Sequence, residues 1–215
     1  MVAFPAIFLT FAALVLEIFS LIGNTYNKPF LKSLYFARIS TSSQTLDFGL
    51  WNYCTGDGSG NIQSCSKPVA AFPWSQAPGL TNIDGLQGHD RLFLAVFVMY
   101  FIATGLTFLA LAITSLNHYS RGSDLCASFA TFIAFIVMLV TFIMGLVIDL
   151  QGIHEVSSAM SGASGHLGPA TWMTLGATVA LLFASGWWLL ACCCGSGRRV
   201  NAYDKEAAGY RRRWW

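Results

Sequence analysis

The chain has 215 residues, of which 55% are hydrophobic and only 10% are charged. Soluble globular domains carry about 25% charged residues, so this composition excludes an ordinary soluble domain and indicates a protein that faces lipid. The formal net charge is only +2, which gives no electrostatic reason to expect nucleic-acid binding.

Four segments are long and apolar enough to cross a membrane, which takes about 20 helical residues. We predict spans at about 2–22, 92–113, 125–148 and 170–191. The predicted fold is an all-α transmembrane four-helix bundle in a membrane domain of residues 1–195, with outer loops at 23–91 and 149–169 and a tail at 196–215. The first span lacks the basic start of a signal peptide, so we expect it to be retained; cleavage is the alternative.

Glu17 is the one ionisable residue inside a predicted span, and such residues are functional candidates because their burial is costly. It belongs to a small and polar stripe with three- and four-residue steps, which should face protein: Thr10, Ala13, Glu17, Ser20 and Asn24. We expect Glu17 to be protonated or bonded to hydroxyls of the bundle. Binding of a partner's membrane helix and conduction of ions or protons are the alternatives.

The first outer loop has the pattern of a small sheet. Residues 35–50 mix aromatic, β-branched and polar side chains, and the turn cluster at 55–61 lets the chain reverse. Cys54 and Cys65 are the only cysteines of this loop; on an oxidising face they favour a disulfide over a zinc site, which wants four ligands. We predict a disulfide-stapled extracellular β-sheet, to which residues 149–168 can add a strand or a helix extension.

Candidates for chemistry lie beside the outer helix ends: His89, Asp90, His154, Glu155 and His166. No pair among them has the i, i+4 spacing of a helical metal site, and the sequence has no P-loop, nucleophile elbow or dinucleotide motif. We therefore predict no catalytic residues, no cofactor and no metal.

The tail is basic, whereas residues 149–167 contain no Lys or Arg, so both termini should be cytoplasmic. Cys192, Cys193 and Cys194 stand where the last span leaves the membrane, and the basic run after them favours S-palmitoylation over inert thiols. The tail also joins arginines to two interfacial tryptophans, which suits anionic lipid; a solvated tail or a partner-binding peptide is the alternative. The residues concerned are Arg198, Arg199, Arg211, Arg212, Arg213, Trp214 and Trp215.

A short motif in the first loop carries a family resemblance. Gly49, Leu50 and Trp51, followed by Cys54 and Cys65, have the G-L-W-x2-C-x10-C spacing that resembles the first extracellular loop of the claudin superfamily. Arg91 matches that group's arginine at the mouth of the second helix. The run FGLWNYC is most similar to the fungal PalI-related group, which includes the eisosome-associated tetraspans of the yeast plasma membrane. The chain lacks the earlier tryptophan of animal claudins, which argues against a tight-junction role.

The resemblance implies a plasma-membrane protein that organises an eisosome-like domain without catalysis, with roles in cell-wall and endocytic organisation. Expected partners are anionic or ordered lipids, other membrane proteins or copies of itself, and cell-wall components. An accessory subunit of a signalling or transport complex of the ambient-pH-sensing type is the alternative, and a channel is less favoured. Within the motif, Trp51 should anchor the sheet at the membrane interface, Gly49 should permit close backbone approach, and Arg91 should tie loop carbonyls to the bundle.

Overall fold

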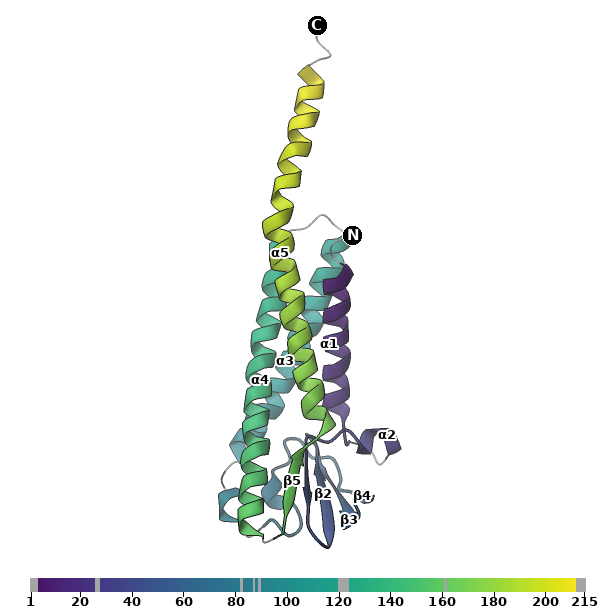
Figure 1. Cartoon of the computed structure of the whole chain (residues 1–215), viewed down its shortest axis with the longest axis vertical. Helices are drawn as coiled ribbons and strands as arrows, with labels where there is room; N and C mark the ends of the chain where they lie inside the picture. The colour runs from purple at the N-terminus through teal and green to yellow at the C-terminus, as the bar shows by residue number, and fades with distance from the viewer. Residues whose placement is uncertain are drawn as a thin grey trace.

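Four long helices stand side by side in the computed structural model (Figure 1): α1 (Phe4–Ile22), α3 (Asp90–Tyr119), α4 (Asp124–Ala159) and α5 (Pro169–Arg211). The structure describes residues 4–25, 28–81, 83–86, 88, 90–119, 124–160 and 162–211, and only the backbone at 29, 84, 117–119, 124–125 and 191–211. All four helices contain a stretch long and apolar enough to cross a membrane. The predicted four-helix transmembrane bundle is confirmed.

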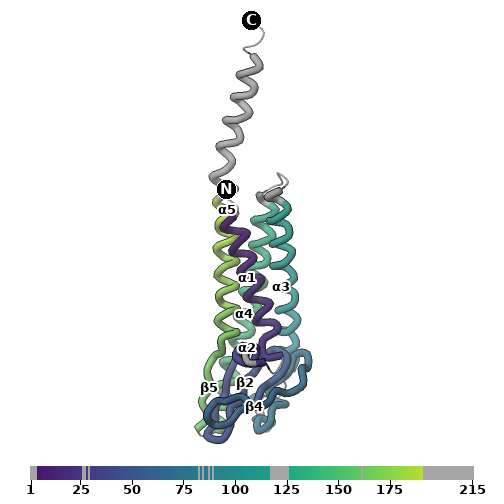
Figure 2. The backbone as a smooth tube through the Cα atoms, turned by 90° about the vertical axis from the view of Figure 1, so that its right-hand side faces the viewer, coloured from purple at the N-terminus to yellow at the C-terminus, as the bar shows by residue number. Residues whose placement is uncertain are grey.

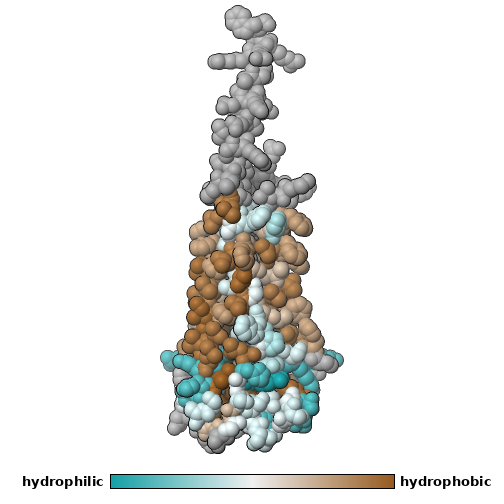
Figure 3. Space-filling model, viewed as in Figure 1, coloured by the Kyte–Doolittle hydropathy of each residue, from teal (hydrophilic) through white to brown (hydrophobic). Residues whose placement is uncertain are grey.

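The bundle interior is built from small side chains. α1 packs against α5 and α3, while α4 packs against α3 and α5. The central cluster combines alanines with a few larger residues, and small residues let helices approach closely within a membrane. Its members are Ala13, Tyr100, Ala103, Ala110, Ala134, Met138, Ala177 and Leu181. Large apolar side chains such as Phe108 and Phe183 point outward instead, and they give the bundle the hydrophobic surface seen in Figure 3.

α4 is longer than the predicted span. Its 36 residues correspond to about 54 Å of helix, whereas the hydrocarbon layer is about 30 Å thick. The excess lies at the sheet end, where Ile153 and Val156 pack into the core beneath the sheet. The second loop thus supplies a helix extension and also a strand.

The sheet has five antiparallel strands in the order β4-β3-β2-β1-β5, and it lies at one end of the bundle, opposite the start of α1 (Figures 1 and 2). The strands are β1 (Ala37–Ser40), β2 (Gln44–Phe48), β3 (Tyr53–Asp57), β4 (Ile62–Cys65) and β5 (Ser164–Leu167). Cys54 and Cys65 are paired residues of β3 and β4 and form the predicted disulfide. A one-turn helix, α2 (Pro29–Lys32), precedes β1.

One face of the sheet packs against α4 and the loop that follows β4. Phe48 and Trp74 stack with ring centroids 4.2 Å apart, and both are almost fully buried. A Cβ at Gly152 of α4 would lie 2.4 Å from the Trp74 ring, so the helix approaches this ring more closely than any side chain at 152 would allow. This packing fixes the sheet to the protruding end of α4.

Candidate functional site

Trp51 of the predicted loop motif joins the sheet to two helices. Its indole Nε1 donates a hydrogen bond to the carbonyl of Leu21, in the last turn of α1, at 2.7 Å. The ring also meets two phenylalanines of α3 edge-on, with centroid distances of 4.8 Å to Phe97 and 5.9 Å to Phe101. Trp51 therefore fixes the connection between β2 and β3 against the helix ends.

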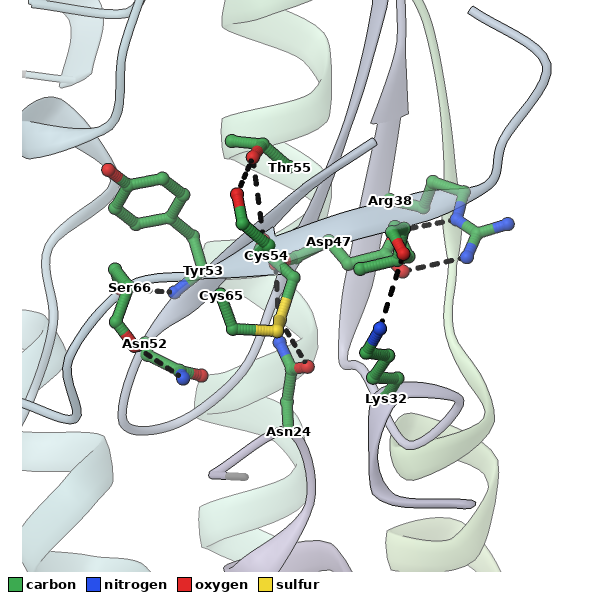
Figure 4. Close-up of a disulfide and its surroundings, with 12 residues drawn as sticks. Asn24, Lys32, Arg38, Asp47, Asn52, Tyr53, Cys54, Thr55, Cys65 and Ser66 are labelled. Carbon is green, nitrogen blue, oxygen red and sulfur yellow. Dashed lines mark hydrogen bonds and ion pairs between the residues drawn. A yellow bond between two sulfur atoms is a disulfide. The ribbon is translucent and has the colours of Figure 1, made fainter. Parts of the chain in front are cut away.

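Asn24, just after α1, lies at the centre of the junction between sheet and bundle (Figure 4). Its side chain is fully buried, and its Nδ2 donates to the carbonyl of Asp47 at 3.3 Å. Its Oδ1 lies 2.8 Å from Sγ of Cys54; this contact is not a hydrogen bond, because a disulfide sulfur carries no proton. A Cβ at Gly49 would approach the Asn24 Cβ to 2.8 Å, so only glycine fits there.

The backbone of Asn24 is left-handed, with φ of 62°. This conformation ends α1 and turns the chain so that the Asn24 amide donates to the carbonyl of Leu31 at 2.9 Å. Asparagine follows glycine as the residue most used at this position after a helix. Asn24 was predicted only as part of the polar stripe of α1, although an asparagine two residues after the predicted span is a signal for this helix end.

A buried ion pair crosses β1 and β2. Arg38 Nε lies 2.5 Å from Asp47 Oδ1 and Nη2 lies 2.7 Å from Oδ2, a two-pronged contact that is also drawn in Figure 4. Asp47 is fully buried; burial raises its pKa, and the bonds from Arg38 oppose this effect. The same bonds raise the pKa of Arg38, which also lies 4.3 Å from the centroid of the Tyr35 ring. The pair keeps a buried carboxylate satisfied inside the sheet.

The sequence analysis did not single out this pair. Arg38 and Asp47 are nine positions apart, and their register follows from the turn between β1 and β2. Opposite charges facing each other on neighbouring strands stabilise a sheet, which is the signal that could have revealed them.

Glu17 is enclosed by the bundle. Its side chain is fully buried, and Oε1 accepts a hydrogen bond from Thr107 of α3 at 2.9 Å, while Oε2 has no hydrogen-bond partner among the described residues. Other polar contacts also join different helices: the hydroxyls of Tyr100 and Thr174 lie 3.0 Å apart, and Ser20 donates to the carbonyl of Ala170 at 3.4 Å. The arrangement places Glu17 among contacts that hold helices together, away from the lipid surface.

The remaining predicted residues are scattered. Arg91 lies exposed in the first turn of α3, and its contact with loop carbonyls stays a prediction. His154 and His166 are exposed and Glu155 is half-buried. Within the described part of the chain, no three His, Cys, Asp or Glu residues lie close enough to hold a metal ion.

The predicted acylation and lipid-binding residues cannot be placed as side chains. His89, Arg212, Arg213, Trp214 and Trp215 lie outside the described residues. Only the helical backbone of α5 is described at Cys192, Cys193, Cys194, Arg198, Arg199 and Arg211. Acylation of the cysteines and binding of the tail to lipid stay predictions.

Two comparisons with known proteins identify relatives of this chain. The sequence model of the SUR7/PalI family matches residues 2–185. The chain is also similar to Protein PUN1 of Saccharomyces cerevisiae (strain ATCC 204508 / S288c), with 38% identity over 86 residues, which cover 30% of this chain and 32% of the yeast protein. The chain thus spans about a third of the length of the curated relative it matches.

Proposed function

The chain belongs to the SUR7/PalI family, and we propose on that premise that it organises a domain of the fungal plasma membrane, of the eisosome type, without catalysing a reaction. It is a multi-pass membrane protein with four apolar helices. In the proposed arrangement the sheet faces the cell exterior and both termini face the cytoplasm. The sheet then meets the cell wall or neighbouring copies, and the tail meets anionic or ordered lipid.

The observation that carries this proposal is the rigid junction between sheet and bundle. Trp51 bonds the end of α1, Asn24 bonds β2 beside the disulfide, and Thr171 of α5 donates to the carbonyl of Phe36 at 2.9 Å. Each of these polar groups is used to fix one element against another. A fixed outer surface on a lipid-facing bundle suits a scaffold, because lateral order among copies depends on a constant shape.

Imaging in living yeast cells tests the proposal. A fluorescent fusion of the full chain should gather in stable membrane patches with slow recovery after photobleaching. Trp51→Leu should weaken patch retention because it removes one of the contacts that fix the sheet against the helices. Phe108→Leu, a change on the lipid-facing surface, is the matched control and should leave the patches intact. A uniform, fast-recovering distribution of the parent protein would overturn the organiser role.

The orientation is tested separately with two epitopes. One is inserted in the turn at 57–61 between β3 and β4, and the other is placed after residue 197. After removal of the cell wall, antibody should reach the first epitope on intact cells and the second only after permeabilisation. The reverse pattern would contradict the proposed topology.

The second candidate function is that of an accessory subunit for sensing ambient pH. One observation favours it: exposed His166 of β5 is the cross-strand partner of Arg38, and its charge acts on buried Asp47. The charge of the His166 side chain therefore reaches the ion pair of Arg38 and Asp47. Replacement of His166 by Gln should then abolish the pH response of the cell, while the same change at His154 should not; an unchanged response in H166Q would exclude this function.

A further inference from the structure

A partly enclosed cavity of about 50 Å³ lies where the sheet meets the bundle. Residues of α3, α4, α5, the β2 end and the loop after β4 form its walls. The lining is mainly apolar, and its aromatic part includes Phe36, Phe48, Phe72, Trp74, Phe93 and Phe142. Such a small, apolar space with few polar groups is typical of a site for part of a small molecule.

The cavity lies at the depth of the membrane boundary. α1 has 19 residues, about 29 Å of helix, which matches the hydrocarbon layer, so its end marks the boundary on the sheet side. Trp51 is bonded to this end, and its neighbours Gly49 and Leu50 line the cavity. Counting along α4 places Asp149 about 35 Å from Cys126, where the apolar stretch of α4 begins, so Asp149 lies within about one helical turn of the same boundary.

Asp149 is the acidic residue of the cavity wall, and its side chain is more than nine-tenths buried. Of the described side chains, only the Thr171 hydroxyl acts on its carboxyl group, and the single proton of that hydroxyl is donated to the carbonyl of Phe36 at 2.9 Å. A carboxyl group can accept several hydrogen bonds. Asp149 therefore keeps acceptor capacity that no described residue uses and that faces the cavity. The other lining hydroxyls, on Tyr100, Thr141 and Thr174, already have protein partners.

Gly145 lies one helical turn before Asp149 on the same face of α4, and it also lines the cavity. A Cβ at this position would meet no atom within 4 Å, so close packing does not explain the glycine. Glycine is disfavoured inside helices. Its effect here is to leave the space beside Asp149 open.

We propose that this cavity binds the hydroxyl end of a neutral membrane lipid. The hydroxyl donates to Asp149, the aromatic walls enclose the adjoining carbons, and the rest of the lipid lies against the apolar surface of the bundle. The volume, which corresponds to about four water molecules, excludes a phospholipid headgroup.

Two kinds of lipid offer this chemistry, a sterol and a lipid alcohol such as diacylglycerol, and the experiment separates them. The proposal goes beyond the proposed function and does not depend on it. The purified full chain in lipid nanodiscs is photolabelled with a diazirine sterol, with its methyl ether, with a diazirine diacylglycerol and with a diazirine phosphatidylcholine. Mass spectrometry then maps the labelled peptides.

A hydroxyl probe, either the sterol or the diacylglycerol, should label the part of α4 around Phe142 and Asp149, and the unlabelled lipid should compete. Loss of the donor in the methyl ether should lower sterol labelling about two- to tenfold, the range of one net hydrogen bond. The probe that labels this part of α4 shows whether the bound lipid is a sterol or a diacylglycerol. Absence of labelling by both, or equal labelling by the sterol and its ether or by phosphatidylcholine, would overturn the proposal.

Variants of Gly145 and Asp149 test the roles of these two residues in lipid binding. Gly145→Leu should fill the cavity and abolish competable labelling, whereas Gly105→Leu, at a helical glycine of α3 with equal free space outside the cavity, should leave it unchanged. Asp149→Leu should remove the difference between the sterol and its ether, and Asp149→Asn, which keeps a carbonyl acceptor, should retain it. If Asp149→Leu does not fold, the comparison of the sterol with its methyl ether on the parent protein still tests whether the lipid hydroxyl donates a hydrogen bond. Persistent labelling in Gly145→Leu would place the lipid elsewhere.

Discussion

Asn24 should contribute more to stability than its position after a membrane helix suggests. Replacement by alanine removes the bond to the carbonyl of Asp47 at 3.3 Å, which contributes about 0.5–1.5 kcal/mol. Alanine must also adopt φ of 62°, which costs about 1–2 kcal/mol for a residue with a Cβ and without asparagine's local hydrogen bonds. Together they correspond to a loss of about 1.5–3.5 kcal/mol in the free energy of unfolding.

Glycine at the same position separates these two contributions. Asn24→Gly loses the side-chain bond but adopts the left-handed backbone freely, so it should be less destabilising than Asn24→Ala. Thermal unfolding of the purified protein in detergent, without reductant, measures both. A change of 1 kcal/mol corresponds to about 2–4 °C for a chain of this size, so Asn24→Ala should lower the Tm by about 3–14 °C.

Asn61 provides the control for this series. It is exposed in the turn between β3 and β4, where its side-chain amide donates to the Ser59 hydroxyl at 3.0 Å. Asn61→Ala should change the free energy of unfolding by less than about 0.5 kcal/mol. An effect of Asn24→Ala as mild as that of Asn61→Ala would contradict the predicted role of Asn24. Equal destabilisation by glycine and alanine at position 24 would show that the left-handed backbone contributes nothing.

Three further changes test other parts of the structure. Replacement of Cys54 and Cys65 together by serine should lower stability by about 3 kcal/mol, because the unfolded chain regains the freedom of an 11-residue separation; thermal unfolding measures this, and no change in Tm would contradict it. Glu17→Gln keeps an oxygen acceptor for Thr107 and should alter the Tm little. Glu17→Leu removes this acceptor and should lower the free energy of unfolding by about 1–3 kcal/mol. Equal effects of the two changes would show that the hydrogen bond does not contribute to stability. Asp57 is bonded within its turn by residues 59 and 61, which lower its pKa, so its stabilising effect is complete above the unfolded pKa of 3.8 and fades as the pH falls below it. The Tm difference between Asp57→Ala and the parent should therefore shrink as the pH is lowered from 7 to 3. A Tm difference that grows on acidification would contradict the lowered pKa of Asp57.

The spans, the sheet and the disulfide could be predicted because each depends on a local pattern. A run of apolar residues predicts a membrane helix without reference to its neighbours, and two cysteines in one loop have no other partner there. The β-type composition of residues 35–50 likewise predicted strands at β1 and β2. In these cases the physical cause and the sequence signal lie in the same short segment.

The junction between sheet and bundle could not be predicted in the same way. β5 joins the sheet beside β1 although more than 120 positions separate them, and the sequence of residues 164–167 does not predict that it pairs with β1. The contacts of Asn24 with β2 and of Trp51 with the end of α1 also join distant segments. Their existence depends on how the loop folds back over the helix ends, which hydropathy and periodicity do not determine.

The two acids of the bundle show why burial alone does not identify a binding site. Glu17 accepts a hydrogen bond from Thr107 on the neighbouring helix, so its cost of burial is partly offset inside the protein, and its removal should be felt as lost stability. Asp149 lines an open space, beside a glycine whose missing side chain keeps that space free. The unused acceptor capacity at Asp149 is best satisfied by a molecule that enters from the membrane. A carboxyl group that stabilises helix packing is thus distinguished from one that binds a ligand by its surroundings: Glu17 contacts a neighbouring helix, whereas Asp149 lines a cavity.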